Sequence, residues 1–240
     1  MRILLIRPII SPREDAQEEA IFRPFLSPGT EITARRLKYA SSSIECEYDV
    51  AVNTPDILRV AAEGQAEGFD GAIINCFVDP GLEAVREAVT YPVVGAGSAA
   101  VQLALSVGKR IAILTIVPNI LPLVRRLNAD YMASGRVCAV RSIDVPVLSI
   151  YGDQLIYEKL YEQAVAAIQQ DHADAIVFGC TGLGGMAEKV QQRLAENGMP
   201  VPVVDPAGAS VSMLEALIRN RLTHSKLTWM APPEKLRNLK

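Results

Sequence analysis

The sequence is poor in the residue types on which several common functions depend. Only two of its 240 residues are histidines, and only 5% are aromatic. Binding of single-stranded nucleic acid uses aromatic side chains for stacking, and duplex binding uses a positively charged surface. The chain has few aromatic residues and a formal net charge of −3. We therefore expect no nucleic-acid partner.

Membrane and metal functions are disfavoured in the same way. No apolar run approaches the ~20 residues of a membrane-spanning helix, and the run at residues 3–6 is too short for the core of a signal peptide. The four cysteines show neither C-x-x-C nor C-x-x-H spacing, which argues against a zinc site. We expect a cytoplasmic protein with reduced thiols, no metal ion and no membrane partner.

Short aliphatic runs alternate with helix-type patterns along the whole chain. This alternation, with half of the residues hydrophobic, is typical of α/β proteins with parallel sheets. The expected strands are residues 3–6, 30–34, 73–74, 92–95, 110–116, 137–143, 175–178 and 201–204. The expected helices are residues 14–22, 55–68, 79–89, 99–107, 119–132, 155–170, 184–197 and 207–222.

An internal repeat divides the chain into two similar parts. A strand, a cysteine, a helix and a further strand occur around Cys76, and the same series returns around Cys180 about half a chain length later. We predict two pseudo-symmetric lobes, each a mainly parallel sheet flanked by helices, with the active site in the cleft between them. The first lobe would contain residues 1–96 plus 206–240, and the second residues 97–205. The tail after residue 226 should pack over a lobe surface.

Both cysteines are expected at the carboxyl end of a strand and at the start of a helix. Ligands bind at that edge of open parallel sheets. Backbone N–H groups and the helix dipole should lower the thiol pKa from ~8.5. A thiolate and a thiol facing each other can take a proton from one face of a carbon and give one to the other face. This inverts a stereocentre next to a carbonyl without a cofactor, and backbone N–H groups at residues 77–78 and 181–182 would stabilise the enolate.

Simpler interpretations apply to most single residues. A lone cysteine in an apolar strand is usually an inert core residue, and we expect this for Cys46 and Cys138. For Cys76 or Cys180 alone the core interpretation is equally good, but their matching contexts favour a chemical role. A disulfide between them is disfavoured in a reducing compartment. Asp79 is expected to cap a helix rather than to act as a catalytic acid.

At these residues the sequence resembles the aspartate/glutamate/hydantoin racemase superfamily, and specifically its hydantoin and allantoin racemase branch. The two cysteine motifs at their spacing are the specific part of the resemblance. The matching segments, which span essentially the whole chain, are residues 28–31, 43–45, 76–82, 92–95, 145–148, 179–182, 202–205 and 223–226.

The resemblance implies a cofactor-independent racemase or epimerase that acts on a small-molecule substrate with a hydantoin-type ring. Cys76 and Cys180 would each act as the base for one enantiomer and as the acid for the other. Homo-oligomers are usual in the family, so we expect one here. The residues that would contact the substrate, carried over by position, are Ser11, Phe77, Val78, Thr115, Thr181 and Gly182.

The sequence departs from the family pattern around the expected substrate. The first strand usually ends in Asn-Pro-Asn-Thr, where this chain has residues 7–10, Arg-Pro-Ile-Ile, and Val78 replaces a usual glycine. We therefore expect Arg7 and Ile10 at the substrate and an altered recognition. An arginine in the cleft could bind a small carboxylate in place of a hydantoin-like ring. The alternatives are a cis-trans isomerase or decarboxylase of the same superfamily, or a non-catalytic small-molecule binding protein.

Overall fold

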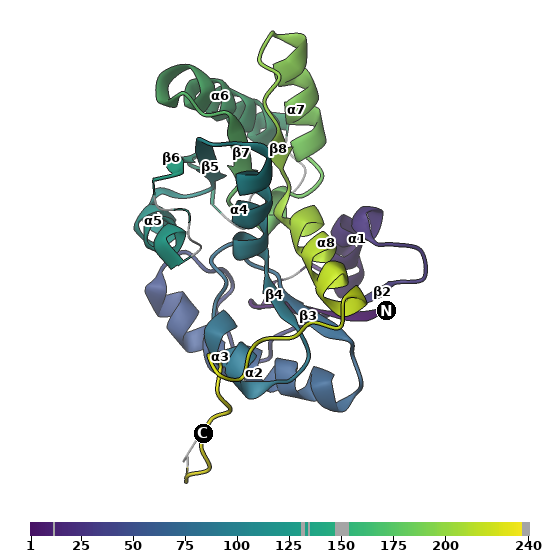
Figure 1. Ribbon diagram of the computed structural model, residues 1–240. Helices are drawn as coiled ribbons and strands as arrows, with labels where there is room; N and C mark the ends of the chain where they lie inside the picture. Colours follow the sequence, from purple (N-terminus) through teal and green to yellow (C-terminus); the bar gives the residue numbers. More distant parts are fainter. Residues whose placement is uncertain (12, 131–132, 134, 147–153, 237–240) are drawn as a thin grey trace.

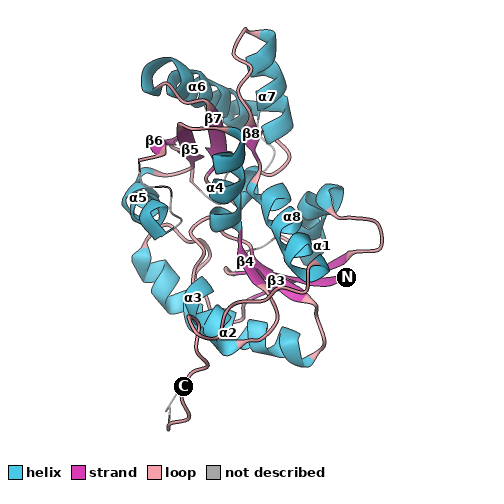
Figure 2. Cartoon of the chain, in the orientation of Figure 1, coloured by secondary structure: helices cyan, strands magenta, loops and turns pink. Residues whose placement is uncertain are grey.

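The computed structural model describes residues 1–236 except 12, 131–132, 134 and 147–153 (Figure 1). The chain forms two four-stranded sheets with the strand orders β2-β1-β3-β4 and β6-β5-β7-β8. Neighbouring strands are parallel throughout both sheets. Helices cover the sheets, which lie toward opposite ends of the molecule (Figure 2). The predicted α/β fold with two similar lobes is confirmed.

The first sheet is buried on both faces, as its aliphatic strands predict. Leu4 and Ile6 pack with α2 and α3 on one face, while Ile3 and Leu5 pack with α1 and α8 on the other. The elements of this half are β1 (Arg2–Arg7), α1 (Asp15–Phe22), the 3-10 turn η1 (Arg23–Phe25), β2 (Glu31–Arg36), α2 (Glu47–Ala66), β3 (Gly71–Ile74), α3 (Leu82–Ala88) and β4 (Val93–Gly95).

The second sheet repeats this arrangement. Ala112 and Leu114 pack with α6 and α7, and Ile111 and Ile113 face the opposite core. Its elements are β5 (Ile111–Thr115), η2 (Pro118–Ile120), α5 (Leu121–Asp130), β6 (Val137–Ser142), α6 (Gln154–Asp171), β7 (Ala175–Phe178), η4 (Thr181–Leu183), α7 (Ala187–Glu196) and β8 (Val203–Val204). Within the described part of the chain, no helix has the length and apolar character to cross a membrane.

Two helices cross between the sheets and pack against each other. Helix α4 (Ala96–Val107) follows β4 but packs against β7 and β8 of the second sheet, and α8 (Pro206–Arg219) follows β8 but packs against β3 and β4. Small residues at this crossing, such as Ala100 and Ala209, belong to the shared core. Each sheet is therefore covered by a helix that begins at the other. The division at residues 96 and 206 stays a prediction.

Helix α2 begins earlier than the sequence predicts. It starts at Glu47, so Pro55 lies inside the helix rather than at its start. A proline has no N–H and leaves the carbonyl four residues before it without its helical partner. That residue, Ala51, is exposed, so water can bind its carbonyl. Helices α3 and α7 also begin about three residues later than predicted, because a turn precedes each of them.

The tail after α8 is bound to α3 and β4. His224 Nε2 accepts a hydrogen bond from the backbone N–H of Val93 at 2.8 Å, and Trp229 donates to Glu83. Lys226 donates to three carbonyls at the end of α3, where a cation is favoured by the helix dipole. Burial lowers the pKa of His224 to about 4. Lys226 and Trp229 thus hold the start of the predicted tail on the lobe surface, as expected, whereas residues 231–236 are exposed and extend away from it (Figure 1).

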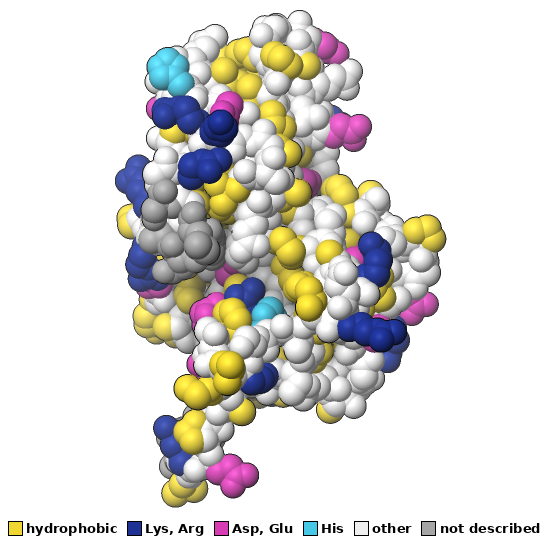
Figure 3. All heavy atoms as spheres, in the orientation of Figure 1, with side chains coloured by type: hydrophobic (Ala, Val, Ile, Leu, Met, Phe, Trp, Pro, Cys, Tyr) yellow, Lys and Arg dark blue, Asp and Glu magenta, His cyan; other side chains and the backbone are white. Residues whose placement is uncertain are grey.

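Hydrophobic side chains gather over α4 and α8 on the face drawn in Figure 3. Leu103 and Val107 of α4 and Phe25 of η1 remain 41%, 52% and 38% exposed. They border a groove that runs between α4, α7 and α8. This groove is separate from the cavity that contains Cys76 and Cys180.

Candidate active site

Cys76 and Cys180 line one cavity of about 70 Å³ between the two lobes. Each cysteine follows the last residue of its strand by two positions, Ile74 in β3 and Phe178 in β7. The carboxyl ends of strands from both sheets therefore meet at this cavity. Its other described lining residues are Arg7, Pro8, Ile9, Glu18, Ile44, Asn75, Phe77, Val78, Thr115, Ile116, Val117, Ile120, Gly179, Thr181 and Gly182.

The loop after Cys76 is fixed to the first turn of α4. Asp79 is buried, has a positive φ of 49°, and accepts hydrogen bonds from the backbone N–H groups of Gly97 and Ser98, both at 2.8 Å. It therefore caps α4 and not α3, the helix that follows it. The prediction that Asp79 caps a helix is confirmed, but the helix that it caps is α4 and not the predicted one, α3.

Two glycines make this contact sterically possible. A Cβ atom at Gly95 would lie 2.2 Å from Asp79 Cγ, and one at Gly97 would lie 1.8 Å from the carbonyl oxygen of Phe77. The close approach of the loop to α4 thus requires residues without side chains. The position of Phe77, next to Cys76, depends directly on Gly97.

The loop after Cys180 is fixed by a different carboxylate. Asp205 is the N-cap of α8 and accepts a hydrogen bond from the backbone N–H of Ala207 at 2.9 Å. Its second oxygen accepts one from Gly185 in the cysteine loop at 3.0 Å. The two cysteine loops also meet directly, since the hydroxyl of Thr181 donates to the backbone carbonyl of Asn75 at 3.5 Å.

Burial raises the pKa of both thiols, to about 12 for Cys76 and about 11 for Cys180. The backbone N–H groups of Val78 at Cys76, and of Gly182 and Leu183 at Cys180, act in the opposite direction but are outweighed. Cys180 and Asp79 raise the pKa of Cys76 further, and Glu18 raises that of Cys180. The predicted lowering of the thiol pKa is wrong. Neither cysteine is directly followed by a long helix: α3 begins six residues after Cys76, and Cys180 precedes only a three-residue turn.

Comparison with known proteins identifies the family. A profile of the Asp/Glu/hydantoin racemase family matches residues 17–214. The chain belongs to this family. The hydantoin racemase of Rhizobium meliloti is 36% identical over 205 residues, which cover 85% of this chain and 83% of that protein. The hydantoin racemase of Paenarthrobacter aurescens is 30% identical over 238 residues, 98% of this chain and 99% of that protein.

Solved structures give the same result. The allantoin racemase from Klebsiella pneumoniae superposes with a TM-score of 0.93 at 33% identity, covering 100% of this chain and 97% of that one. Arylmalonate decarboxylase shares the fold at 20% identity, with a TM-score of 0.63 over 91% of this chain and 92% of that one. The chain lies in the hydantoin and allantoin racemase branch and is an isomerase of the racemase type.

Six of the eight predicted substrate contacts line the racemase cavity, and two do not. Arg7, Phe77, Val78, Thr115, Thr181 and Gly182 surround it with the two cysteines. After Ile9 the chain turns toward Ser41, whose carbonyl accepts a hydrogen bond from the backbone N–H of Ile10, and the side chain of Ile10 is exposed. The Ser11 hydroxyl is buried and accepts from the N–H of Arg13. Ile10 and Ser11 are therefore not among the described residues that line the cavity, and their contact with a substrate stays a prediction.

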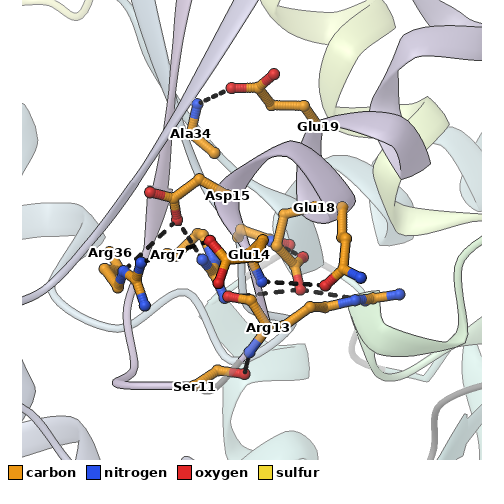
Figure 4. A network of polar contacts seen from close by, with 11 residues as sticks. Arg7, Ser11, Arg13, Glu14, Asp15, Glu18, Glu19, Ala34 and Arg36 are labelled. Atoms are coloured by element: carbon orange, nitrogen blue, oxygen red, sulfur yellow. Dashed lines mark hydrogen bonds and ion pairs between the residues drawn. The ribbon is translucent and has the colours of Figure 1, made fainter.

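Arg7 lines the cavity, but its guanidinium forms ion pairs with carboxylates of the first lobe. Its guanidinium is buried, pairs with Asp15 and donates to the carbonyl of Arg13 at 3.0 Å (Figure 4). One nitrogen lies 4.0 Å from Glu18, whose same oxygen accepts from Arg13 at 3.1 Å. Two cations and two carboxylates thus balance each other at the wall of the cavity. Asp15 of the same chain thus pairs with the guanidinium that we expected to bind a substrate carboxylate. A contact of Arg7 with the substrate stays a prediction.

The sequence analysis missed two polar residues of the cavity wall, Glu18 and Asn75. Glu18 comes from α1 and accepts a hydrogen bond from Asn75 Nδ2 at 3.1 Å. Asn75 Oδ1 is buried, and no donor among the described residues reaches it. A polar residue directly before Cys76, at the end of an apolar run, was the available signal for Asn75. Glu18 carries no such signal, because it lies in a run of acidic residues.

The other two cysteines lie outside this cavity. Cys138 is half-buried against the core of the second lobe, as expected. Cys46 is exposed at the N-cap of α2 and contacts Asp49, so its assignment to the core is wrong. It follows the serine-rich loop rather than an apolar run. In the described parts of the chain, no group of three His, Cys, Asp or Glu residues is arranged to hold a metal ion.

Proposed function

We propose that this racemase inverts a carbon next to a carbonyl in a hydantoin-type ring, without a cofactor, by proton transfer through Cys76 and Cys180. The observation that carries the proposal is that two thiols, from equivalent strand ends of two sheets, line a single cavity. A ring carbon between them would present one face to each lobe.

The reaction balances with the two thiols alone. One thiolate removes the proton from the carbon and becomes a thiol, and the electron pair moves into the adjacent carbonyl as an enolate. The opposite thiol then protonates the other face of the carbon and becomes the thiolate. The ionised residue has changed sides, so each cysteine is the base for one enantiomer. Proton transfer by a positioned group contributes ~10²–10⁴-fold to the rate.

The backbone around the cysteines would stabilise the charged species. N–H groups of Val78, Gly182 and Leu183 favour the ionised form of the adjacent thiols. We assign the enolate oxygen to backbone N–H groups at residues 77–78 and 181–182, since preorganised donors at a developing oxyanion are among the largest catalytic contributions.

Cavity size and relatives support a small ring as the substrate. A volume of about 70 Å³ is compatible with a compact molecule. Proteins similar over most of this chain are named hydantoin racemase and allantoin racemase. We further expect a homo-oligomer in the cytoplasm, where the thiols stay reduced, and light scattering of the purified protein would give the oligomer size.

Deuterium exchange tests the proposal directly. The protein is incubated in heavy water with each enantiomer of 5-methylhydantoin, and NMR follows loss of the proton at the ring carbon while polarimetry follows inversion. We expect exchange and inversion with wild type, and a loss of about 10²–10⁴-fold in Cys76→Ser and in Cys180→Ser. Cys46→Ser and Cys138→Ser are the matched controls, and these should remain within a few-fold of wild type.

Three other results of the deuterium-exchange experiment would contradict the two-thiol mechanism. Full turnover in either Cys76→Ser or Cys180→Ser would refute the two-thiol mechanism. A large loss in only one of them would indicate one-cysteine chemistry, as in an isomerase or decarboxylase. Tight binding of the ring without exchange in wild type would indicate a binding protein.

A further inference from the structure

Asn75 and Glu18 form a polar edge of the cavity that the two-thiol reaction leaves unused. Asn75 is 9% exposed and Glu18 is 7% exposed, and both line the cavity with Cys76 and Cys180. Neither residue is needed to move the proton. Their role must therefore be sought in binding.

The orientation of the Asn75 amide is fixed by its partner. Glu18 forms an ion pair with Arg13 at 3.1 Å. A carboxylate only accepts hydrogen bonds, so the amide group 3.1 Å from its second oxygen must be the NH₂ of Asn75. The amide oxygen then points away from Glu18. It is buried and lacks a donor among the described residues.

A buried acceptor without a donor is rare in native proteins and calls for an explanation. Because Asn75 lines the cavity directly beside Cys76, a bound ligand can supply the missing donor. The ligand must then carry an N–H or O–H group close to the carbon that Cys76 deprotonates.

The charges around the cavity disfavour an anion. Arg7 is the only cation among the described lining residues, and its guanidinium is already paired with Asp15 and close to Glu18. The Glu18 carboxylate adds negative potential, which reaches Cys180 and raises the pKa of its thiol. A substrate carboxylate would therefore lose its hydration without gaining a free cation.

From these contacts we infer that Asn75, held in place by Glu18, is the specificity-determining acceptor for a ring N–H of a neutral substrate, and that the cavity rejects the ring-opened carboxylate. This inference rests on the proposed function for the location of the substrate. Glu18 is a positioning residue, since it acts through the Asn75 amide.

Binding of N-methylated probes measures this contact without catalysis. Calorimetry on the Cys76→Ser/Cys180→Ser protein compares 5-methylhydantoin, its 1-methyl and 3-methyl derivatives, and the anionic, ring-opened N-carbamoylalanine. One of the two N-methyl groups should weaken binding about 10- to 100-fold by removing the donor to Asn75. N-carbamoylalanine should bind more weakly than the ring.

A second substitution isolates Asn75. In the same protein with Asn75→Leu, which is close in size but has no acceptor, the penalty for that methyl group should fall below about threefold. The matched control is Asn128→Leu, because Asn128 is also buried with an unpartnered Oδ1 but does not line this cavity. The control should retain the full methyl penalty. If Asn75→Leu does not fold, Asn75→Ala, which also has no side-chain acceptor, serves the same comparison.

The outcomes separate this inference from the proposed function. An unchanged methyl penalty in the Asn75 variants, or tighter binding of N-carbamoylalanine than of the ring, overturns the inference. A penalty that depends on Asn75, in a protein whose wild type shows no deuterium exchange, supports the inference and refutes the racemisation of hydantoins. Deuterium exchange in wild type, together with a methyl penalty that does not depend on Asn75, supports the racemisation of hydantoins and refutes the inference.

Discussion

The loops after Cys76 and Cys180 are each held by hydrogen bonds between a carboxylate and backbone N–H groups. The carboxylate and the N–H groups exchange places between the two lobes. In the first lobe the carboxylate lies in the cysteine loop, as Asp79, and the N–H groups belong to the start of α4. In the second lobe the carboxylate is the N-cap of α8, Asp205, and the N–H group belongs to the loop, at Gly185. Both arrangements tie a cysteine loop to the helix that crosses to the other lobe.

The N-cap position explains the exchange. The N-cap of α4 is Gly95, which has no side chain, so the carboxylate of Asp79 occupies the space where a capping side chain would lie. The N-cap of α8 is Asp205, which caps its own helix. A carboxylate therefore caps the start of both crossing helices. It comes from the cysteine loop at α4 and from the helix's own N-cap residue at α8. Asp79 and Asp205 each accept two hydrogen bonds. Asp79 is buried and lies in the cysteine loop itself, whereas Asp205 is half-buried and binds its cysteine loop through one N–H group, so we infer that Cys76 is held more rigidly.

The strongest test of the comparison adds a methyl group where α4 touches the Cys76 loop. In Gly97→Ala the new Cβ would meet the carbonyl oxygen of Phe77 at 1.8 Å, so the loop must move. We expect kcat/KM to fall by about 100-fold or more, as misplacement of a catalytic group by 1 Å does, with a stability loss of ~1–3 kcal/mol. Deuterium exchange and chemical unfolding measure the two effects.

The matched control lies at the same position of α8. Ala207 follows the Asp205 N-cap by two residues, as Gly97 follows Gly95. Ala207→Gly should reduce the free energy of unfolding by about 1 kcal/mol and leave kcat/KM within a few-fold. Equal losses of activity in the two variants would show that the loops do not differ in this way.

Removal of each carboxylate should have an intermediate effect and should differ between the lobes. Asp79→Ala leaves two buried N–H groups without an acceptor, and we expect a loss of about 2 kcal/mol or more in the free energy of unfolding. Asp205→Ala removes a half-buried N-cap and should cost about 1 kcal/mol. Urea unfolding of both variants gives the comparison. A larger loss for Asp205→Ala than for Asp79→Ala would reverse our conclusion about rigidity.

The smallest difference concerns the thiols themselves. Burial raises the pKa to about 12 for Cys76 and about 11 for Cys180, so the thiolate is the minor form of each cysteine at pH 7 and its fraction rises tenfold per pH unit above it. We expect Cys180 to react with iodoacetamide about 3- to 10-fold faster than Cys76 at pH 8, since a lower thiol pKa gives more thiolate but slightly weaker nucleophiles.

Peptide mass spectrometry of a Cys46→Ser protein measures the two alkylation rates without interference from the exposed thiol. Both rates should continue to increase from pH 7 to pH 9. A plateau near pH 8 at either cysteine would mean that its pKa is not raised, and equal rates would remove the difference between the lobes.

The sequence predicted the fold well because its main signals are local. Aliphatic runs such as residues 3–6 and 175–178 became central strands, and the repeated motif predicted that Cys76 and Cys180 face one cavity. The helix boundaries that were predicted wrongly depend on individual hydrogen bonds of the backbone. Pro55 is accepted inside α2 because Ala51 faces solvent, and this exposure is a property of the folded chain.

Tertiary contacts account for what the sequence did not predict at the site. The partners of Asp79 lie in α4, beyond an intervening helix and strand, so its local motif pointed to the wrong helix. Glu18 reaches Asn75 only after α1 has folded against the first sheet. The thiol pKa depends on how deeply the two lobes bury the cysteines, which no motif around Cys76 or Cys180 records. Arg7 was placed at the cavity correctly, but its pairing with Asp15 required the structure.

The crossing of α4 and α8 has a consequence for attempts to divide the protein. A cut near Gly108 would give an amino-terminal fragment that carries α4 without the second sheet, and a carboxyl-terminal fragment that carries α8 without the first. Each fragment would then expose an apolar helix and an uncovered sheet face that only the other can bury. The two halves are thus built for complementation in trans, in which the cavity forms only when both pieces associate.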